Sequence, residues 1–154
     1  VLMLSLTVLS AAFVMGSTIP PPYVCGAVSP PLSWSKVPEE TKSIAILCDD
    51  PDAPIGDWVH WVLFNLPPDT QSLDAEQPRD ANLPNGAVQG INDYRRNGYD
   101  GPCPPAGSTH RYYFKVYALD TMLNLGPKTR KPDLLKAMEG HILAKGELMG
   151  KFGR

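Results

Sequence analysis

The stretch WVHWVLFNL at residues 58–66 decides the fold class of this protein. In an extended chain successive side chains point to opposite faces, and here both faces are apolar. One face carries Trp58, His60, Val62 and Phe64, and the other carries Val59, Trp61 and Leu63. An extended segment with two apolar faces is covered on both sides, so these residues predict a central strand of a β-sheet.

Three other segments are expected to be strands. Residues 42–48 (KSIAILC) form a short apolar run that ends at the turn sequence Asp49-Asp50-Pro51. Residues 87–91 follow the turn signal Asn85-Gly86. Residues 110–120 (HRYYFKVYALD) alternate in polarity. Their apolar face consists of His110, Tyr112, Phe114, Val116 and Ala118, and their wetter face consists of Arg111, Tyr113, Lys115 and Tyr117.

The two ends of the chain carry different signals. The first fifteen residues, VLMLSLTVLSAAFVM, are apolar, but no Lys or Arg precedes them and the run is too short to span a bilayer. We favour a buried strand or strand pair there over a targeting segment. Toward the other end, Pro132 opens a helical stripe. The stripe consists of Leu134, Leu135, Met138, Ile142 and Leu148, and Gly140 and Gly146 weaken it or end it early.

Composition limits the architecture and the function classes. The 154 residues suit a single domain over 1–154, and 43% apolar with 19% charged residues argues against disorder. Seventeen prolines and thirteen glycines predict frequent turns, with loops at 17–31, 67–85 and 92–109. At a cis frequency of about 5–6%, about one X–Pro bond should be cis, within 50–54 or 101–105. A net charge of −2 excludes a nucleic-acid binder that works by neutralising phosphates.

The three cysteines leave the redox state of the chain open. Cys25, Cys48 and Cys103 form no C-x-x-C pair, so a zinc knuckle and a thioredoxin-like motif are excluded. Their odd number favours a reducing compartment, and with it a cytoplasmic location. One bridge with one free thiol, in a periplasmic or secreted protein, stays open as the alternative. Whether Cys25 and Cys103 are bridged is left undecided.

Two histidines are the candidate functional side chains. The chain lacks nucleotide-binding glycine motifs, H-E-x-x-H and G-x-S-x-G. His60 and His110 lie on apolar faces of expected strands, and a buried imidazole needs a hydrogen-bond partner. Asp50 and Asp52, just beyond a strand end, are candidate partners. The alternatives are that both histidines are satisfied core residues, and that the aspartates only initiate a turn.

Other polar residues are interpreted as structural. His141 falls on the expected helix and is taken as a residue without a ligand. Arg95 and Arg96 are taken as a solvated loop pair rather than as a phosphate clamp.

Five motifs occur in an order and at a spacing that resemble a known family. They are S-P-P-L-S-W at 29–34, D-D-P-D-A-P at 49–54, W-V-H-W at 58–61, N-G-Y-D-G-P-C-P-P at 97–105 and H-R-Y-Y-F at 110–114. Together they resemble the phosphatidylethanolamine-binding protein family, in its bacterial and archaeal Raf-kinase-inhibitor-like branch. The resemblance runs over most of the chain and also places the N-terminal apolar segment inside the domain.

The resemblance implies a fold and a set of site residues. The fold is a mainly β domain in which a large central antiparallel sheet is flanked by a smaller sheet, with a C-terminal helix. The site is a small pocket for anions, such as phosphate or a phospholipid head group, and needs no metal and no cofactor. Matched motif by motif, the ligand-binding residues are Asp50, His60, Pro104, Pro105, His110 and Tyr112. Asp52 and Trp58 are expected to contact these residues rather than the ligand itself.

The residue types fit a phosphate-binding role. Imidazole N–H groups and a tyrosine hydroxyl donate hydrogen bonds, and phosphate oxygens accept them. A carboxylate such as Asp50 is compatible with a bound anion if it accepts a hydrogen bond from a histidine. That bond fixes the tautomer of the histidine and favours its protonated form. The prolines make the rim stiff, which reduces the entropy lost on binding.

Three functions compete. The first is a non-catalytic binding protein for a phosphate or phosphorylated head group. The second is a regulator that binds a kinase or a serine protease, as relatives are described to do, through the loops 67–85 and 92–109. The third is a hydrolase that uses His60 and Asp50 as acid and base, which we rank last because no serine or cysteine nucleophile stands in a known motif. A homodimer could involve Trp61, Tyr113 or Tyr117.

Overall fold

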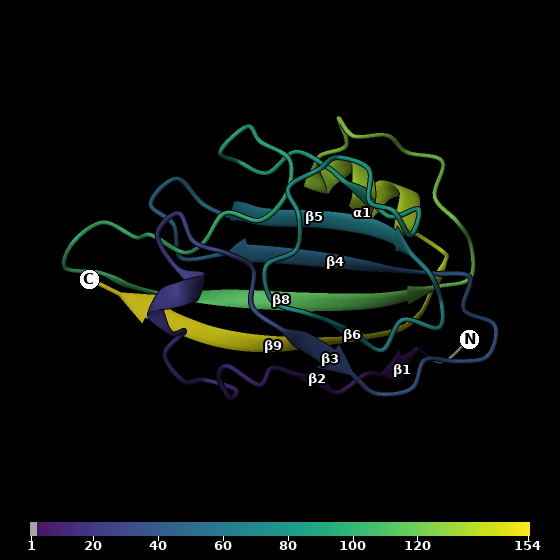
Figure 1. The fold of residues 1–154 in the computed structure, drawn as a ribbon, viewed down its shortest axis with the longest axis horizontal. Helices are drawn as coiled ribbons and strands as arrows, with labels where there is room; N and C mark the ends of the chain where they lie inside the picture. Colours follow the sequence, from purple (N-terminus) through teal and green to yellow (C-terminus); the bar gives the residue numbers. More distant parts are fainter. Residues whose placement is uncertain (1–2) are drawn as a thin grey trace.

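One large sheet forms the centre of the protein (Figure 1). The computed structural model describes residues 3–154, and the six strands of this sheet follow one another in the order β1-β9-β8-β4-β5-β7. Their bounds are Leu4–Ser5 (β1), Ile142–Gly153 (β9), Thr109–Leu119 (β8), Ser43–Asp50 (β4), Trp58–Leu66 (β5) and Val88–Gln89 (β7). The strands are antiparallel except where β1 pairs parallel with β9, so the sheet is mixed.

Three of the four expected strands lie in the interior of this sheet, and the fourth, 87–91, is present only as the two-residue edge strand β7. The segment 58–66 is β5 with the bounds that its pattern predicts, and 42–48 and 110–120 correspond to β4 and β8. β4 lies between β5 and β8 and is buried along its whole length. The more polar face of β8 is only partly exposed to solvent, because Tyr117 on that face is nearly buried. Trp61 is fully buried, so of the three aromatic residues named for a possible homodimer interface it is not accessible at the surface.

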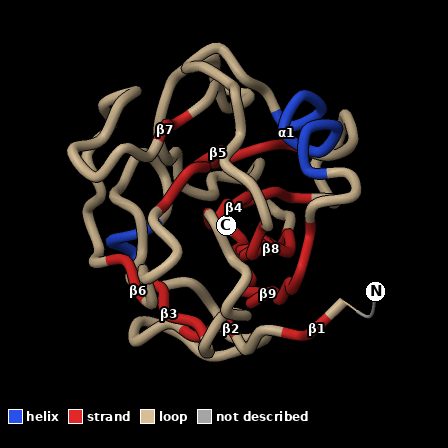
Figure 2. Tube along the Cα trace, turned by 90° about the vertical axis from the view of Figure 1, so that its right-hand side faces the viewer, coloured by secondary structure: helices blue, strands red, loops and turns tan. Residues whose placement is uncertain are grey.

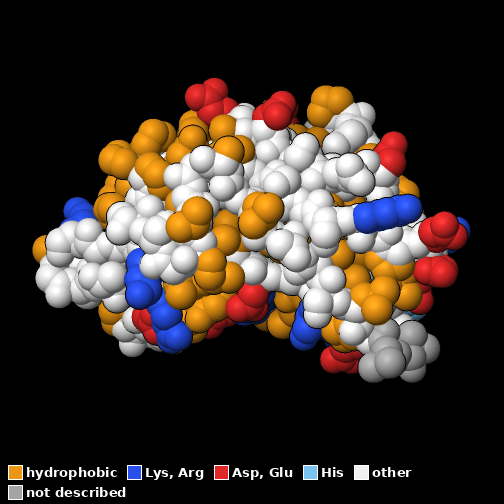
Figure 3. Space-filling view, turned by 90° about the horizontal axis from the view of Figure 1, so that it is seen from below, with side chains coloured by type: hydrophobic (Ala, Val, Ile, Leu, Met, Phe, Trp, Pro, Cys, Tyr) orange, Lys and Arg blue, Asp and Glu red, His pale blue; other side chains and the backbone are white. Residues whose placement is uncertain are grey.

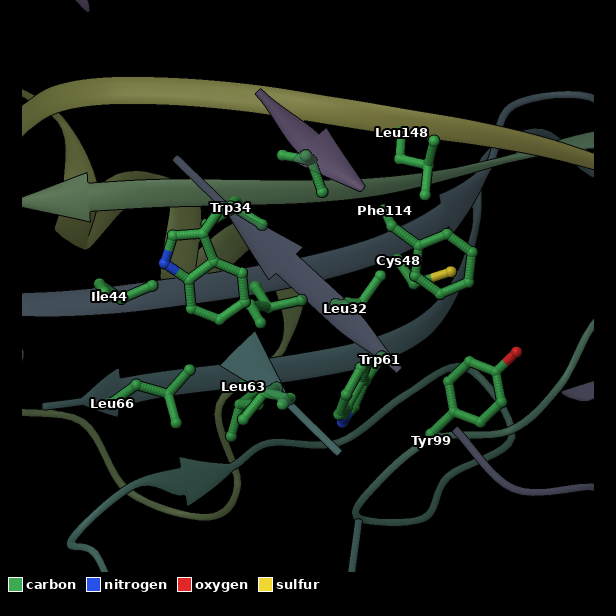
Figure 4. Close-up of a cluster of buried hydrophobic side chains, with 14 of the residues drawn as sticks. Leu32, Trp34, Ile44, Cys48, Trp61, Leu63, Leu66, Tyr99, Phe114 and Leu148 are labelled. Atoms are coloured by element: carbon green, nitrogen blue, oxygen red, sulfur yellow. The ribbon is translucent and has the colours of Figure 1, made fainter. Parts of the chain in front are cut away.

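The large sheet is covered by a small sheet on one face and by a helix on the other (Figure 2). The small sheet consists of β2 (Val8–Leu9), β3 (Leu32–Trp34) and β6 (Ser72–Leu73). Between the two sheets lies an apolar cluster in which Trp34 and Leu32 meet Ile44, Leu63 and Phe114 (Figure 4). A second cluster joins the opposite face of the large sheet to the helix. The predicted fold class, a large sheet flanked by a smaller one with one helix, is therefore confirmed.

The helix is shorter than its sequence pattern predicts. α1 (Lys131–Met138) begins with Pro132 in its first turn, and the Asp133 carboxylate accepts the backbone N–H of Arg130 at 3.0 Å. Gly140 follows it at φ +78°, a left-handed conformation that favours glycine and ends the helix. The chain then enters β9, so Ile142 and Leu148 belong to a strand and not to the helical stripe.

The apolar N-terminal segment forms two short strands that belong to different sheets and are only partly buried. β1 borders β9 of the large sheet, and β2 belongs to the small one. Leu6, Val8 and Phe13 point into the core, whereas alternating neighbours such as Val14 reach the surface. Figure 3, seen from the side of these strands, shows hydrophobic side chains scattered over this surface among charged ones. Val1 and Leu2 lie outside the described residues.

The connections are rich in proline, and parts of them are buried, including Ile19 in 17–31 and Asp100 in 92–109. The loop 17–31 contains a single turn of 3-10 helix, η1 (Pro21–Tyr23), and 92–109 contains no helix or strand longer than a bridge until β8 begins. Every X–Pro bond among residues 3–154 is trans, so the expected cis proline is not found. The expectation came from a frequency of about 5–6% per bond, at which seventeen trans bonds are a common outcome.

The pairing of the cysteines, which the sequence left undecided, is visible in the structure. Cys25 and Cys103 form a disulfide across 78 residues of chain, and Cys48 is a buried free thiol. No helix in the described part of the chain is long and apolar enough to cross a membrane.

Candidate functional site

Three strands end together at one edge of the large sheet, on the left of Figure 1. β4 ends at Asp50, while β5 begins at Trp58 and β8 begins at Thr109. Because β4 is antiparallel to both neighbours, the end of β4 lies beside the beginnings of β5 and β8. The loops 51–57 and 92–108 leave or enter the sheet here, and they carry the D-P-D-A-P and G-P-C-P-P motifs.

A β-bulge turns His60 toward this edge. Cys48 of β4 pairs with Trp61, but the next residue, Asp49, pairs with Val59, so His60 has no partner in the ladder. An extra residue of this kind interrupts the alternation of side chains and re-aims the bulged one. The His60 ring consequently packs 5.3 Å from the ring of Tyr112. The expected placement of His60 on one face with Val62 and Phe64 is therefore wrong.

His110 is paired with a buried carboxylate. Its Nδ1 donates to Oδ2 of Asp50 at 2.7 Å, and the two side chains are only 7% and 3% exposed. The backbone N–H of Asp52 donates to the other oxygen of Asp50 at 2.7 Å. The orientation of the carboxylate is thus fixed by the D-P-D-A-P turn, and the partnership between Asp50 and a histidine is present as the sequence suggests.

His60 is held by the backbone of the long loop. Its Nδ1 donates to the carbonyl oxygen of Asp100 at 2.6 Å, and the backbone N–H of Asp100 donates back to the carbonyl of His60 at 3.1 Å. Burial lowers the pKa of His60, because the low-polarity surroundings disfavour the charged ring. Neutral His60 therefore carries its proton on Nδ1 and presents Nε2 as an acceptor.

The carboxylate of Asp100 anchors this loop. It accepts hydrogen bonds from Asn92 at 2.6 Å and from Arg79 at 3.0 Å, and Arg96 pairs with it as well. Arg79 also donates to the carbonyl of Asn97 at 3.0 Å. Asp100 lies inside the N-G-Y-D-G-P-C-P-P motif, but nothing in the sequence marks it as a residue that anchors the site. Arg96 is solvated as expected, since its side chain is 58% exposed, but its guanidinium also pairs with this buried carboxylate.

These residues surround a cavity of about 290 Å³. Polar groups of Asp50, His60, His110 and Tyr112 share it with a hydrophobic wall. The wall consists of Ala53, Pro54, Ile55, Trp58, Tyr94, Cys103, Pro104 and Pro105. All six residues that we expect to bind a ligand thus line one cavity. Trp58 belongs to the wall itself rather than lying behind it, and Ile55 and Tyr94 are wall residues that the sequence analysis did not name.

Both tyrosines of the cavity stay protonated over the physiological range. Burial raises the pKa of Tyr112 well above its usual value, and the nearby charge of Asp50 adds to the effect. Burial raises the pKa of Tyr94 in the same way. A phenol that keeps its proton can donate a hydrogen bond.

Asp52 does not line the cavity but fixes the turn beside it. Its carboxylate accepts two hydrogen bonds from the Arg111 side chain, at 2.8 and 2.9 Å, and one from the Arg111 backbone at 2.9 Å. These bonds lower the pKa of Asp52 to about 2. Asp52 thus supports the site from outside, as the sequence analysis expects.

The proline-rich rim is fastened at several points. Cys103 is bonded to Cys25, and the backbone N–H of Cys25 donates to the carbonyl of Pro102 at 2.8 Å. Arg154 donates to the carbonyl of Pro104 at 2.9 Å. A side chain at Gly101 would clash with the backbone of the 3-10 turn, so the rim packs tightly against η1. The wall is therefore held in place before any ligand arrives.

The remaining histidine lies elsewhere. Nδ1 of His141 is 2.7 Å from Asp120 at the protein surface, just beyond α1 rather than on it. Within residues 3–154, no cluster of three or more histidine, cysteine, aspartate or glutamate side chains is arranged to hold a metal ion.

Known proteins resemble this chain over nearly its whole length. The family model described as "Phosphatidylethanolamine-binding protein" matches residues 9–153. The "UPF0098 protein" of Methanothermobacter thermautotrophicus is 54% identical over 138 residues, which cover 88% of this chain and 91% of that protein. The "UPF0098 protein" of Pyrococcus horikoshii is 44% identical over 149 residues, covering 94% of this chain and 75% of that one.

Two solved structures share the fold. A homologue of the phosphatidylethanolamine-binding proteins from Chlamydia trachomatis aligns with a TM-score of 0.88 and 41% identity, over 97% of this chain and 98% of that one. YbcL of E. coli, described as a new member of the mammalian family, aligns with a TM-score of 0.90 and 33% identity, over 97% and 99%. The matched residues, the fold and the sequence motifs agree, and the chain belongs to the phosphatidylethanolamine-binding protein family.

Proposed function

We propose that this protein binds a phosphate or a phosphorylated head group in the cavity at the edge of the large sheet, and that it does so without converting the ligand. The observation that carries the proposal is the convergence of His60, His110 and Tyr112 on one small cavity. Each side chain comes from a strand. The Tyr112 hydroxyl can donate to an oxyanion, and each imidazole, whose Nδ1 is already engaged, can donate from Nε2 when that nitrogen carries a proton. The low polarity of the wall strengthens such bonds.

The size and stiffness of the cavity support a small ligand. A volume of about 290 Å³ lies at the lower end of small-molecule sites and suits a phosphate with a short substituent. The fastened proline rim means that little conformational entropy is lost when the ligand enters. Exposed apolar side chains such as Ile55 stand at the mouth, where an organic substituent would lie.

The chemistry of the described wall supports binding without turnover. Cys103 contributes a sulfur that is engaged in a disulfide, and the hydroxyl of nearby Ser108 donates to the carbonyl of Pro105 at 2.7 Å. Neither is placed beside a base in the manner of an activated nucleophile. We therefore expect no release of product from nitrophenyl phosphate or bis(nitrophenyl) phosphate. Steady turnover that disappears in His110→Ala would contradict this part of the proposal.

An NMR titration tests the binding itself. We expect inorganic phosphate and glycerophosphoethanolamine to shift the imidazole signals of His60 and His110 in a saturable way. His141 is a control in the same molecule, and its signals should stay in place because it lies outside the cavity. If neither anion moves the signals of His60 and His110 more than those of His141, the proposal fails.

A matched pair of tyrosine variants tests the geometry. Tyr112→Phe keeps the ring and removes one hydroxyl from the cavity, so we expect affinity for phosphate to fall about 2- to 10-fold. Tyr113→Phe makes the same chemical change on the next residue, which is not part of the wall, and should leave the affinity unchanged. Isothermal titration calorimetry measures both. Equal effects of the two substitutions would contradict the assignment of the cavity.

A further inference from the structure

The hydrogen bonds of His60 decide which of its nitrogens can meet a ligand. Nδ1 is occupied by the carbonyl of Asp100, so only Nε2 remains for a group in the cavity. The position of that carbonyl is fixed because the carboxylate of the same residue is held by Arg79 and Arg96. The neutral ring therefore presents an acceptor to the cavity, whereas an unprotonated phosphate oxygen is also an acceptor. The two atoms cannot form a hydrogen bond unless a proton lies between them.

The cavity holds no surplus positive charge that could replace this proton. Among residues 3–154, none of the side chains that line it is a lysine or an arginine. If His110 is charged, its charge is balanced by Asp50 at 2.7 Å. Two arginines adjoining this end of the sheet are engaged elsewhere: Arg111 of β8 pairs with Asp52, and Arg154 donates to the carbonyl of Pro104. An anion with two charges would consequently enter a site whose formal charge is zero or negative.

The other groups that face His60 do not change this balance. Tyr94 and Tyr112 lie with their rings 5.7 and 5.3 Å away, and both are uncharged because burial raises their pKa values. Asp49, on the neighbouring strand β4, is neutralised by Lys115 and Lys131 at 3.0 and 2.8 Å. Burial of His60 itself lowers its pKa, so the free protein does not store the required proton there at neutral pH.

We propose that the cavity takes up its anion together with one proton, which lies between Nε2 of His60 and an oxygen of the anion. This inference rests on the proposed function. A phosphate monoester can bring the proton as a P–OH group, since its second pKa is about 6. A phosphodiester has no such group, so its proton must come from the solution and reside on Nε2. In both cases the bound state holds one proton more than the separate protein and the fully deprotonated anion.

Calorimetry in buffers of different ionisation enthalpy counts the protons. We use methyl phosphate for a free monoester and dimethyl phosphate for the diester of a lipid head group. At pH 8 we expect each to take up about one proton, and its affinity to fall about tenfold between pH 7 and pH 8. At pH 5 methyl phosphate already carries the proton, so the uptake of protons when it binds should approach zero. The tighter of the two ligands at pH 7.5 identifies the source of the phosphate, and either result is compatible with the inference.

Two variants locate the proton. His60→Gln places a neutral N–H near the position of Nε2, so we expect it to bind both anions without proton uptake and with a flat pH profile. His141→Gln makes the same change outside the cavity and should behave as the unaltered protein. Proton uptake that persists in His60→Gln would assign the proton to another group and overturn the inference.

A spectroscopic measurement on the unaltered protein keeps the inference testable if His60→Gln does not fold. The ¹⁵N signal of Nε2 of His60 should change from the unprotonated to the protonated range when dimethyl phosphate binds at pH 8. Binding with no proton uptake and no such change would overturn the inference and leave the proposed function standing. Absence of any binding at every pH would instead overturn the proposed function, and the inference with it.

Discussion

At the scale of single residues, His60 shows how backbone geometry sets side-chain chemistry. The bulge in β5 removes it from the ladder, and the carbonyl of Asp100 then holds its Nδ1. His110 has the opposite surroundings, with a carboxylate rather than a carbonyl on the same ring nitrogen. Two histidines from neighbouring parts of the sheet therefore line one cavity, and their Nδ1 atoms bond to different partners. The group that bonds to one ring nitrogen of a histidine orients the ring and sets the basicity of the other nitrogen.

The lowered pKa of His60 predicts how stability depends on pH. The buried ring binds its proton less readily in the folded protein than in the unfolded chain, where its pKa is about 6.5. The contribution of His60 to stability is therefore complete above pH 6.5 and decreases as the pH falls below that value. We expect His60→Asn, whose amide can still donate to the carbonyl of Asp100, to flatten this decrease. Urea denaturation at pH 5 to 7.5 measures it.

His141→Asn serves as the control for this measurement. This histidine is half-exposed and pairs with Asp120 outside the cavity, so its replacement should leave the acid-side decrease caused by His60 in place. A decrease of equal slope in His60→Asn and the unaltered protein would show that burial of His60 is not its cause.

At the scale of elements, α1 illustrates how one side of a short helix attaches to a sheet. Leu134 and Met138, four positions apart, are fully buried against the face of β4 and β5 that carries Leu47 and Phe64. Leu135, the next residue after Leu134, is 40% exposed. An eight-residue helix is too short to be stable alone, so this contact holds it in place.

Two adjacent leucines provide a matched test of that packing. Leu134→Ala leaves a cavity between α1 and the sheet, and we expect a loss of about 2–5 kcal/mol in the free energy of unfolding. Leu135→Ala removes the same atoms from a partly exposed position, and its effect should stay within about 0.5 kcal/mol. Chemical denaturation of both variants gives the comparison. Similar losses for the two would mean that the helix is packed through a different face.

At the scale of the whole molecule, the disulfide joins parts of the chain that are distant in sequence. It connects the loop after η1 with the proline rim of the cavity, closing 78 residues of chain. Within that interval lie the central strands β4 and β5 and the Asp50 carboxylate. The bond thus limits the freedom of the unfolded chain and also fastens one wall of the site.

Reduction of this bond should lower stability and leave the fold intact. Closure of so long a segment predicts a loss of about 2–5 kcal/mol when Cys25 and Cys103 are reduced. We measure the urea midpoint with and without a dithiol reductant. The double variant Cys25→Ala/Cys103→Ala is the control, because its midpoint should be low and insensitive to the reductant. A midpoint of the unaltered protein that does not respond to complete reduction would contradict the expectation.

Much of the fold follows from local patterns in the sequence. Apolar runs and alternation locate β4, β5 and β8, and the fold class follows from these together with the family motifs. The pairing of Asp50 with a histidine could be expected as well, because a buried imidazole beside a strand end needs an acceptor. Strand periodicity is a property of neighbouring residues, and so the sequence alone determined it.

Features that depend on distant contacts required the tertiary structure. The bulge at His60 arises from the register between β4 and β5, and no residue of β5 signals it. The last strand looks like part of a helix until Gly140 ends α1 and β8 offers a partner along its whole length. The hydrogen bonds to the Asp100 carboxylate join residues up to 21 positions apart in the sequence. Composition and spacing determined which side chains this protein can use, whereas three-dimensional packing decided which of them meet, because register, loop closure and burial are set by the whole chain at once.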